Sequence, residues 1–402
     1  MVQKIVYVPV LVTLFSYLLV QVSYKFTLKH PYADLNVEEL ITKYEYPVQV
    51  HHVTTEDGYI LTLQRIPHGR KSGPPQNGPV LLVPGLLQSA WDFVHYGPNH
   101  SLPFLLTEKG YDVWLGNVRG TTWSRKHKTL DPDKDAAYWN YTIEEIAIHD
   151  LPTIIDYILE TTRRNSLHYV GFSQGTSAFF MMGSLRSEYL SKIKLMTAFG
   201  PAVFMKNPRS PIVKFIANNW RTGEILYSFF KRHELFGRSD PVVWYLKYIC
   251  NDENSFLMNL CIHHFFIFAG DNYDELDKSM VPLTTSNYPC GASLRQIVHM
   301  YQMINSGNFC KYDFGSRNLE VYGQEYPPHY DLSKVKVPVA LYYSSNDWIV
   351  DTPNIDRLIQ SLPNVVKSYK VPLEKFSHSD FLYAKNVANL LYNIVIDDIS
   401  KY

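Results

Sequence analysis

Hydrophobic positions along the chain alternate between short β-rich runs and longer runs with helical spacing. The runs at 48–53 and 59–66 flank the turn Glu56-Asp57-Gly58, which predicts an antiparallel hairpin. Between later runs, residues 150–162 carry an apolar helical face, so the crossovers are expected to be helical. Six apolar runs, most typical of buried parallel strands, lie at Pro79–Val83, Tyr111–Leu115, Leu167–Val170, Ile193–Phe199, Val339–Tyr343 and Val365–Lys370. The pattern predicts an α/β fold with a mostly parallel central sheet and helices on both faces.

The regular spacing of the predicted strands is interrupted once along the chain. About 140 residues separate the strand ending near Phe199 from the one starting near Val339, far more than an ordinary α/β connection. We assign the gap to an inserted helical subdomain at residues 200–316, between two parts of the core at 24–199 and 317–402. Its many aromatic residues are consistent with a unit that has its own core, with a cap whose apolar face covers a pocket, or with both.

The first residues read as a targeting segment. Lys4 precedes a charge-free apolar run from Ile5 to Val22, followed by the small residue Ser23. This order is typical of a secretory signal peptide, here residues 1–23, and predicts an extracellular protein. The run approaches the length of a membrane span, so an uncleaved anchor remains an alternative, as does delivery to the lysosome.

Secretion gives meaning to two further features. Asn99 and Asn140 each begin a glycosylation triplet. The short loop between Cys250 and Cys261 favours a disulfide in an oxidising compartment, whereas Cys290 and Cys310 flank a predicted helix that holds them too far apart. Four buried thiols remain the alternative.

Composition excludes several classes of protein. With 46% hydrophobic and 19% charged residues, the chain is neither disordered, nor collagen-like, nor a polytopic membrane protein. The count of Lys+Arg equals that of Asp+Glu, 38 each, which gives no electrostatic footprint for nucleic acid. No zinc-ligand spacing, phosphate loop or dinucleotide fingerprint occurs, so we expect no metal and no cofactor. No obligate protein partner is implied.

One motif carries nucleophilic chemistry. Gly171-Phe172-Ser173-Gln174-Gly175 follows a predicted strand directly and precedes a helical run. Two glycines in a strand-turn-helix context allow a sharp turn that presents the Ser173 hydroxyl above the sheet. A serine nucleophile needs a base, and the base needs an acid to orient it.

The expected order of these groups along the chain is serine, acid, histidine. Asp347 lies just beyond the strand 339–343, and His378 lies just past the last strand. Asp351 competes for the role of the acid but resembles a helix-entry residue before Thr352-Pro353.

An oxyanion hole requires two backbone N–H groups near the serine. Gln174 supplies one because it follows the nucleophile, and the loop after the strand 79–83 should supply the other. In that loop, Gly85 allows a close turn and Leu86 is the expected donor. An ordinary strand-ending turn is the alternative reading.

These residues lie within a longer resemblance, from about Leu35 to Ile396, to the acid lipases of the α/β-hydrolase superfamily, which include gastric, lysosomal and insect lipases. The motifs that carry it are Thr55-Glu56-Asp57-Gly58-Tyr59-Ile60-Leu61, Gly110-Tyr111-Asp112-Val113-Trp114-Leu115-Gly116-Asn117, Arg119-Gly120, Asp150-Leu151-Pro152, and Leu167-His168-Tyr169-Val170-Gly171 leading into Ser173-Gln174-Gly175. The resemblance implies a triad of Ser173, Asp347 and His378, an oxyanion hole of Leu86 and Gln174, and a lipid-covering cap.

Two positions depart from the family pattern. Pro84 replaces the histidine of its usual His-Gly-Leu, and Phe172 replaces the histidine before the serine. Neither change removes a catalytic group, but Phe172 removes an ionisable neighbour, so the family name does not by itself predict an acidic pH optimum.

The sequence thus predicts a secreted serine lipase that hydrolyses neutral-lipid esters, first of all triacylglycerols, through an acyl-enzyme at a lipid–water interface. Alternatives are a cholesteryl-ester hydrolase, a soluble carboxylesterase, and a non-catalytic lipid-binding protein on a hydrolase scaffold. Trp220, Phe229 and Phe230 are the first candidates for cap aromatics that dock to lipid.

Overall fold

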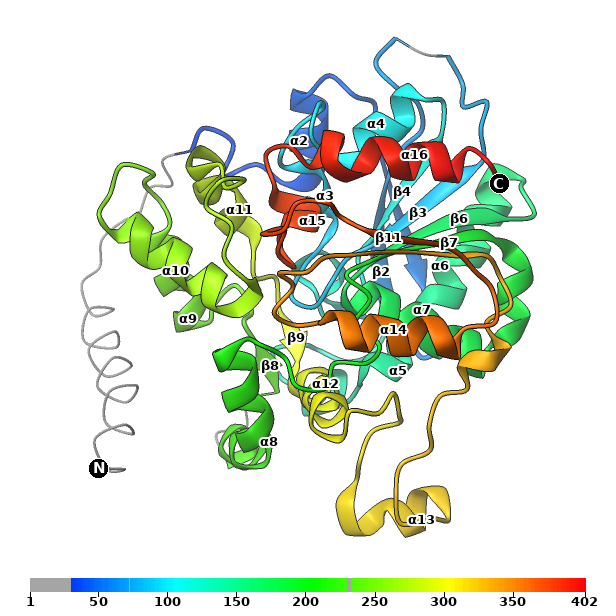
Figure 1. Ribbon diagram of the computed structural model, residues 1–402, viewed down its shortest axis with the longest axis vertical. Helices are drawn as coiled ribbons and strands as arrows, with labels where there is room; N and C mark the ends of the chain where they lie inside the picture. The colour runs from blue at the N-terminus through cyan, green and yellow to red at the C-terminus, as the bar shows by residue number, and fades with distance from the viewer. Residues whose placement is uncertain (1–29, 72, 230–232) are drawn as a thin grey trace.

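The computed structural model describes residues 30–71, 73–229 and 233–402 (Figure 1). The predicted signal peptide and Phe230 lie outside the described residues, as do the side chains of Trp220 and Phe229. Among the residues that are described, no helix is both long and apolar enough to cross a bilayer.

A nine-stranded sheet forms the centre of the molecule. Its path runs β1-β2-β4-β3-β6-β7-β10-β11, with the short β5 paired to β2. The predicted hairpin is present, since β1 and β2 pair antiparallel from Gln49 opposite Arg65 to Thr54 opposite Ile60. All pairs from β4 to β11 are parallel. The strands span Gln49–Thr54 (β1), Tyr59–Ile66 (β2), Pro79–Val83 (β3), Asp112–Gly116 (β4), Lys126–His127 (β5), Leu167–Phe172 (β6), Ile193–Phe199 (β7), Val339–Tyr343 (β10) and Val365–Lys370 (β11).

Side chains alternate between the two faces of this sheet, and each face has its own apolar core. In β3, Leu81 and Val83 pack in one core and Val80 and Leu82 in the other, and all four are buried. The edge strand β11 instead alternates half-buried and exposed positions, so one of its two faces is largely exposed to solvent.

Helices cover both faces, as predicted. The Leu81 face packs against α6 (Leu151–Thr162), α7 (Gln174–Leu185) and α14 (Thr352–Ser361). The opposite face is covered by α2 (Val37–Lys43), α3 (Ala90–Val94), α4 (Leu102–Glu108), α15 (Asp380–Tyr383) and α16 (Asn393–Ile399) (Figure 1). Short α5 (Ile143–Glu145) and a π-helical turn at Ile146–Asp150 lead into α6.

Between β7 and β10 the chain leaves the sheet and forms mainly helices, seen in green to yellow along the left side and the bottom of Figure 1. These are α8 (Pro211–Phe229), α9 (Pro241–Ile249), α10 (Leu257–Ala269), α11 (Val281–Asn287), α12 (Leu294–Ser306) and α13 (Asn318–Tyr322), with a small two-stranded sheet of β8 (Glu234–Leu235) and β9 (Ala292–Ser293). Buried residues of α8 and α12 belong to the same apolar core as the sheet.

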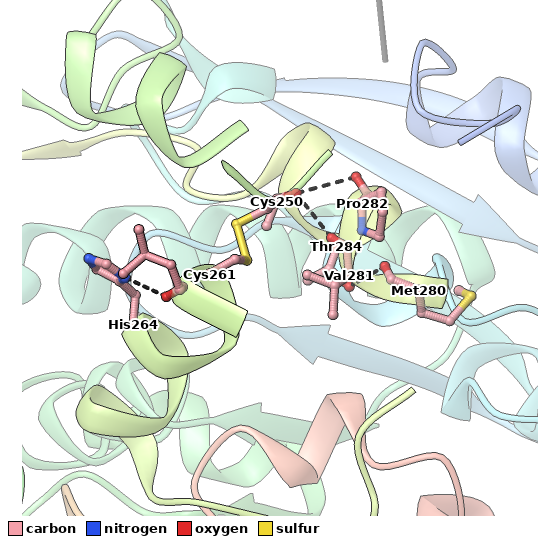
Figure 2. The surroundings of a disulfide bond; sticks show 9 residues. Cys250, Cys261, His264, Met280, Val281, Pro282 and Thr284 are labelled. Carbon is pink, nitrogen blue, oxygen red and sulfur yellow. Dashed lines mark hydrogen bonds between the residues drawn. A yellow bond between two sulfur atoms is a disulfide. The ribbon is translucent and has the colours of Figure 1, made fainter. Parts of the chain in front are cut away.

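A second, smaller core lies farther out in this segment. It surrounds the predicted disulfide, in which Cys250, at the end of α9, bonds to Cys261 of α10 with a Cα–Cα distance of 5.3 Å. Figure 2 shows this disulfide with Val281, Pro282 and Thr284 of α11 beside it. The segment therefore has a core of its own at its outer end and shares the sheet's core at its base.

Candidate active site

The turn that carries Ser173 is shaped by its glycines. It joins β6 to α7, and Ser173 has φ 51° and ψ −116°, a conformation that L-residues rarely adopt. A Cβ on Gly175 would stand 2.4 Å from the carbonyl oxygen of Val83, and one on Gly171 would stand 2.9 Å from the carbonyl carbon of Gly175. Helix, turn and strand therefore pack backbone to backbone, which only glycine permits at these two positions.

The structure brings the three predicted triad residues together. The Oγ of Ser173 lies 2.9 Å from Nε2 of His378, and Nδ1 of His378 lies 2.6 Å from Oδ2 of Asp347. All three are buried, with Ser173 9% exposed. They follow β6, β10 and β11, three strands that run parallel to one another. Because parallel strands end at a common edge, residues far apart in sequence converge there.

Asp347 is positioned by backbone groups. Its Oδ1 accepts hydrogen bonds of 2.8 Å from the N–H groups of Ile349 and Val350, which leaves Oδ2 for the imidazole. Asp351 instead caps α14, where its side chain accepts from the N–H of Asn354. The helix-entry reading of Asp351 is confirmed, and Asp347 is the carboxylate that reaches His378.

Three neighbours fix the position of His378. The ring of Phe172 lies 5.0 Å from the imidazole, centroid to centroid, so the departure at this position places an apolar ring against the histidine. A Cβ on Gly200 would lie 3.0 Å from the imidazole, so this glycine allows β7 to end close to the ring. The backbone N–H of His378 donates to the carbonyl oxygen of Ala269, at the end of α10.

The loop after β3 passes close to the serine. A Cβ on Gly85 would approach the Cβ of Ser173 to 3.2 Å, and Leu86 is half-buried beside it. Among the described residues, the N–H groups of Leu86 and Gln174 donate to no protein acceptor. Two unpaired amides beside a serine hydroxyl are the type of donor that binds an oxyanion in serine hydrolases. The side chain of Gln174 is held by Gln296 of α12, whose Nε2 donates to its Oε1 over 2.8 Å.

A buried polar chain beside this loop escaped the sequence analysis. Gln88 accepts from the N–H of Gly85 and donates to the Tyr383 hydroxyl, which in turn donates to Asp92. Burial raises the pKa of Asp92 to about 7. Tyr383 is nearly three hundred positions from Gln88, so nothing in the local pattern could join them.

The other predicted positions are distributed as follows. Asn99 and Asn140 are exposed, which a glycan acceptor requires. Cys290 and Cys310 are buried free thiols, so the two do not pair with each other, as expected for cysteines that flank a helix. In the described parts of the chain, no group of three or more His, Cys, Asp or Glu residues is placed to hold a metal ion.

Comparison with known proteins supplies a second line of evidence. Residues 37–97 match the model of a partial α/β-hydrolase lipase region, and residues 78–384 match that of the α/β-hydrolase fold. Lipase 1 of Drosophila melanogaster is 40% identical over 92% of this chain and 80% of its own. Human lysosomal acid lipase/cholesteryl ester hydrolase is 35% identical over 94% of both chains, and human gastric triacylglycerol lipase is 34% identical over 92% of both.

Solved structures agree on the fold. A monoglyceride lipase from Saccharomyces cerevisiae superposes with a TM-score of 0.54 at 16% identity, over 94% of this chain and 99% of that one. A structure described as a putative lipase from Sulfolobus solfataricus gives a TM-score of 0.57 at 15% identity, over 89% of this chain and 95% of that one. At such identities the likeness concerns the fold alone.

Proposed function

This chain belongs to the α/β-hydrolase lipase family that includes the lysosomal acid and gastric lipases, and from that premise we propose that it is a secreted serine lipase acting on neutral-lipid esters. A hydrolase acting on ester bonds is what the family establishes. The observation that carries the proposed mechanism is the continuous hydrogen-bonded chain from Ser173 through His378 to Asp347.

In the proposed mechanism, the Oγ of Ser173 attacks the ester carbonyl carbon while its proton passes to Nε2 of His378. Asp347 holds the imidazole in the tautomer that accepts this proton, and the N–H groups of Leu86 and Gln174 bind the oxyanion. The tetrahedral intermediate collapses, the C–O bond breaks, and His378 returns the proton to the departing alcohol. Water then attacks the acyl-enzyme by the same route and releases the fatty acid.

For the substrate we propose triacylglycerol first and cholesteryl ester second, the two lipids that occur in the names of the relatives. Residues 200–316 would act as a cap, with 24–199 and 317–402 forming the hydrolase core. Two described aromatic residues of this segment support contact with lipid, since Phe215 is 67% and Phe256 is 83% exposed. Removal of residues 1–23 and glycans at Asn99 and Asn140 complete the proposal for a secreted enzyme.

The nucleophile is tested by Ser173→Ala. We expect it to abolish labelling by an active-site serine phosphonate and to lower kcat by about 10⁴-fold or more, with an unchanged unfolding midpoint. Hydrolysis by this variant at the wild-type rate would refute Ser173 as the nucleophile. A wild type that neither hydrolyses esters nor takes the phosphonate label would favour a non-catalytic lipid-binding role.

The acid is tested by a matched pair of variants. Asp347→Asn should lower kcat by about 10⁴-fold, because an amide at this position stabilises the wrong imidazole tautomer. Asp351→Asn should leave kcat within about twofold, because asparagine is an equally good helix cap. The reverse ranking would transfer the role of the acid to Asp351.

Substrate class is tested by ester chain length, below and above the solubility limit of each ester. A lipase should act faster on long-chain emulsions than on short soluble esters, and Phe256→Ser should reduce only the emulsion rate. A preference for short soluble esters with no rise at the interface would identify a carboxylesterase instead.

A further inference from the structure

The loop that carries Leu86 is held by a series of hydrogen-bonded side chains in the buried interior. Gln88, at 5% exposure, accepts through Oε1 from the N–H of Gly85 over 3.1 Å, and its backbone N–H donates to the carbonyl oxygen of Gly85 over 3.3 Å. Gln88 therefore forms hydrogen bonds with both the N–H and the C=O of Gly85.

These hydrogen bonds determine the direction of the Leu86 N–H. The carbonyl of Gly85 and the N–H of Leu86 belong to the same planar trans peptide, so they face opposite directions. Because the carbonyl accepts from the backbone N–H of Gln88, the Leu86 N–H is turned away from Gln88, while the side-chain Oε1 of Gln88 holds Gly85 at its own N–H. Rotation of this peptide would break the bond to Gln88 and would replace the oxyanion donor by a carbonyl oxygen.

Gln88 is oriented in turn by Tyr383. Its Nε2 donates to the Tyr383 hydroxyl over 2.7 Å, and that hydroxyl donates to Oδ1 of Asp92 over 2.6 Å. Oδ2 of Asp92 accepts from the N–H of Ser89 over 2.8 Å, so both oxygens of this 2% exposed carboxylate accept hydrogen bonds. Asp92 fixes the direction of the Tyr383 proton, and the amide of Gln88 then has one favourable orientation.

The chain also connects two parts of the candidate active site. Tyr383 ends α15, the short helix that begins two residues after His378, whereas Gln88 lies two residues after Leu86. The loop that carries Leu86 is thereby attached to the segment that carries His378.

We propose that Gln88, held by Tyr383 and Asp92, is a positioning residue that sets the Leu86 N–H toward the oxyanion. This inference rests on the proposed function, because it assigns Gln88 a role in the same hydrolytic site. Gln88 need not touch substrate, and its effect should therefore appear in turnover and in transition-state binding, with little effect on ground-state binding.

The experiment compares Gln88→Met, Tyr383→Phe and the double variant on a short, soluble nitrophenyl ester. We expect Gln88→Met to lower kcat by about 10- to 100-fold with KM within about twofold, and Tyr383→Phe to lower it by about 3- to 30-fold. The double variant should be no slower than Gln88→Met alone, because Tyr383 acts through Gln88. The affinity for a trifluoromethyl ketone, whose hemiketal oxyanion occupies the same site, should fall in proportion to kcat.

Tyr392→Phe is the matched control. Tyr392 is buried and its hydroxyl donates to the carbonyl oxygen of Phe381 in α15, so the change removes a comparable hydrogen bond from the same helix. Its kcat should stay within about twofold of wild type even where its unfolding midpoint falls as far as that of Tyr383→Phe.

Three results would overturn the inference: kcat of both single variants within twofold of wild type, losses that multiply in the double variant, or equal losses in the Tyr392→Phe control. If Gln88→Met does not fold, Tyr383→Phe alone decides, since it removes a single oxygen. These outcomes are distinct from failure of the proposed function, which would show as hydrolysis by Ser173→Ala or as absence of ester hydrolysis by the wild type.

Discussion

The turn that carries Ser173 and the loop that carries Leu86 lie against each other, yet they are held in different ways. In the turn, backbone packs on backbone, and the absence of Cβ atoms at Gly171 and Gly175 permits the φ of 51° at Ser173. In the loop, the backbone is held by side chains, with Gln88, Tyr383 and Asp92 bonded in series. Steric exclusion defines the first region and directional hydrogen bonds define the second.

This difference has a consequence for robustness. A turn fixed by steric contact admits one geometry as long as the fold persists. A loop fixed by hydrogen bonds depends on the protonation and orientation of each member of the chain, since a buried polar group that loses its partner is costly. The two regions should therefore respond differently to pH and to substitution.

The largest expected effect concerns the buried carboxylate of the loop. Burial raises the pKa of Asp92 from 3.8 to about 7, so between these values the folded protein holds a proton that the unfolded chain releases. The contribution of Asp92 to stability is therefore most favourable at low pH and falls as pH rises toward 7. Relative to Asp92→Asn, the free energy of unfolding of the wild type should decline by up to about 4 kcal/mol across this window.

Urea unfolding of both proteins at a series of pH values measures this difference. The titratable groups near Asp92 include Tyr288, Cys290 and Tyr383, whose pKa values are raised by burial, and His95, whose pKa is lowered by burial to about 3. All four therefore stay uncharged in the folded protein across the window. A difference between the two proteins that is constant from about pH 4 to pH 8 would show that Asp92 titrates normally.

The next effect tests the steric side of the comparison. Gly175→Ala places a Cβ 2.4 Å from a backbone oxygen of β3, which cannot move without disturbing the sheet. We expect a loss of about 3 kcal/mol in the free energy of unfolding, together with loss of phosphonate labelling. Gly78→Ala, where a Cβ would meet no atom within 4 Å, is the control and should change neither property. Normal labelling of Gly175→Ala would mean that the turn tolerates displacement.

The smallest effect concerns the backbone strain at Ser173. A side chain at φ 51° and ψ −116° is unfavourable for every residue except glycine. A comparison of two inactive variants isolates the contribution of this backbone strain to stability. The free energy of unfolding of Ser173→Gly should exceed that of Ser173→Ala by about 1 kcal/mol. Equal stability of the two variants would indicate that the turn carries no such strain.

The same contrast explains what was predictable from the sequence. Glycines at fixed spacing around Ser173 are a local pattern, and β3, β7 and β10 have the predicted bounds because their apolar runs end where the strands end. Asp347 and His378 were found because strand ends meet at one edge of a parallel sheet. Tyr383 bonds to Gln88 through tertiary packing alone, and neither residue has a local signature. The packing of α8 and α12 against the core of the sheet could not be predicted either, because it also arises from tertiary packing without a local sequence pattern.

The hydrogen bonds of the Ala269 carbonyl oxygen limit how segments of this protein can be exchanged with those of other lipases. It accepts both the His378 N–H, at 3.2 Å, and the Trp348 N–H, at 3.3 Å, so one peptide at the end of α10 joins the loop that carries Asp347 to the loop that carries His378. Gly270 follows it so tightly that a Cβ would stand 2.3 Å from the carbonyl oxygen of Asn346. Segment 200–316 is therefore not an exchangeable module. A chimaera that takes this segment from another lipase must take the loops at 346–348 and 377–378 with it.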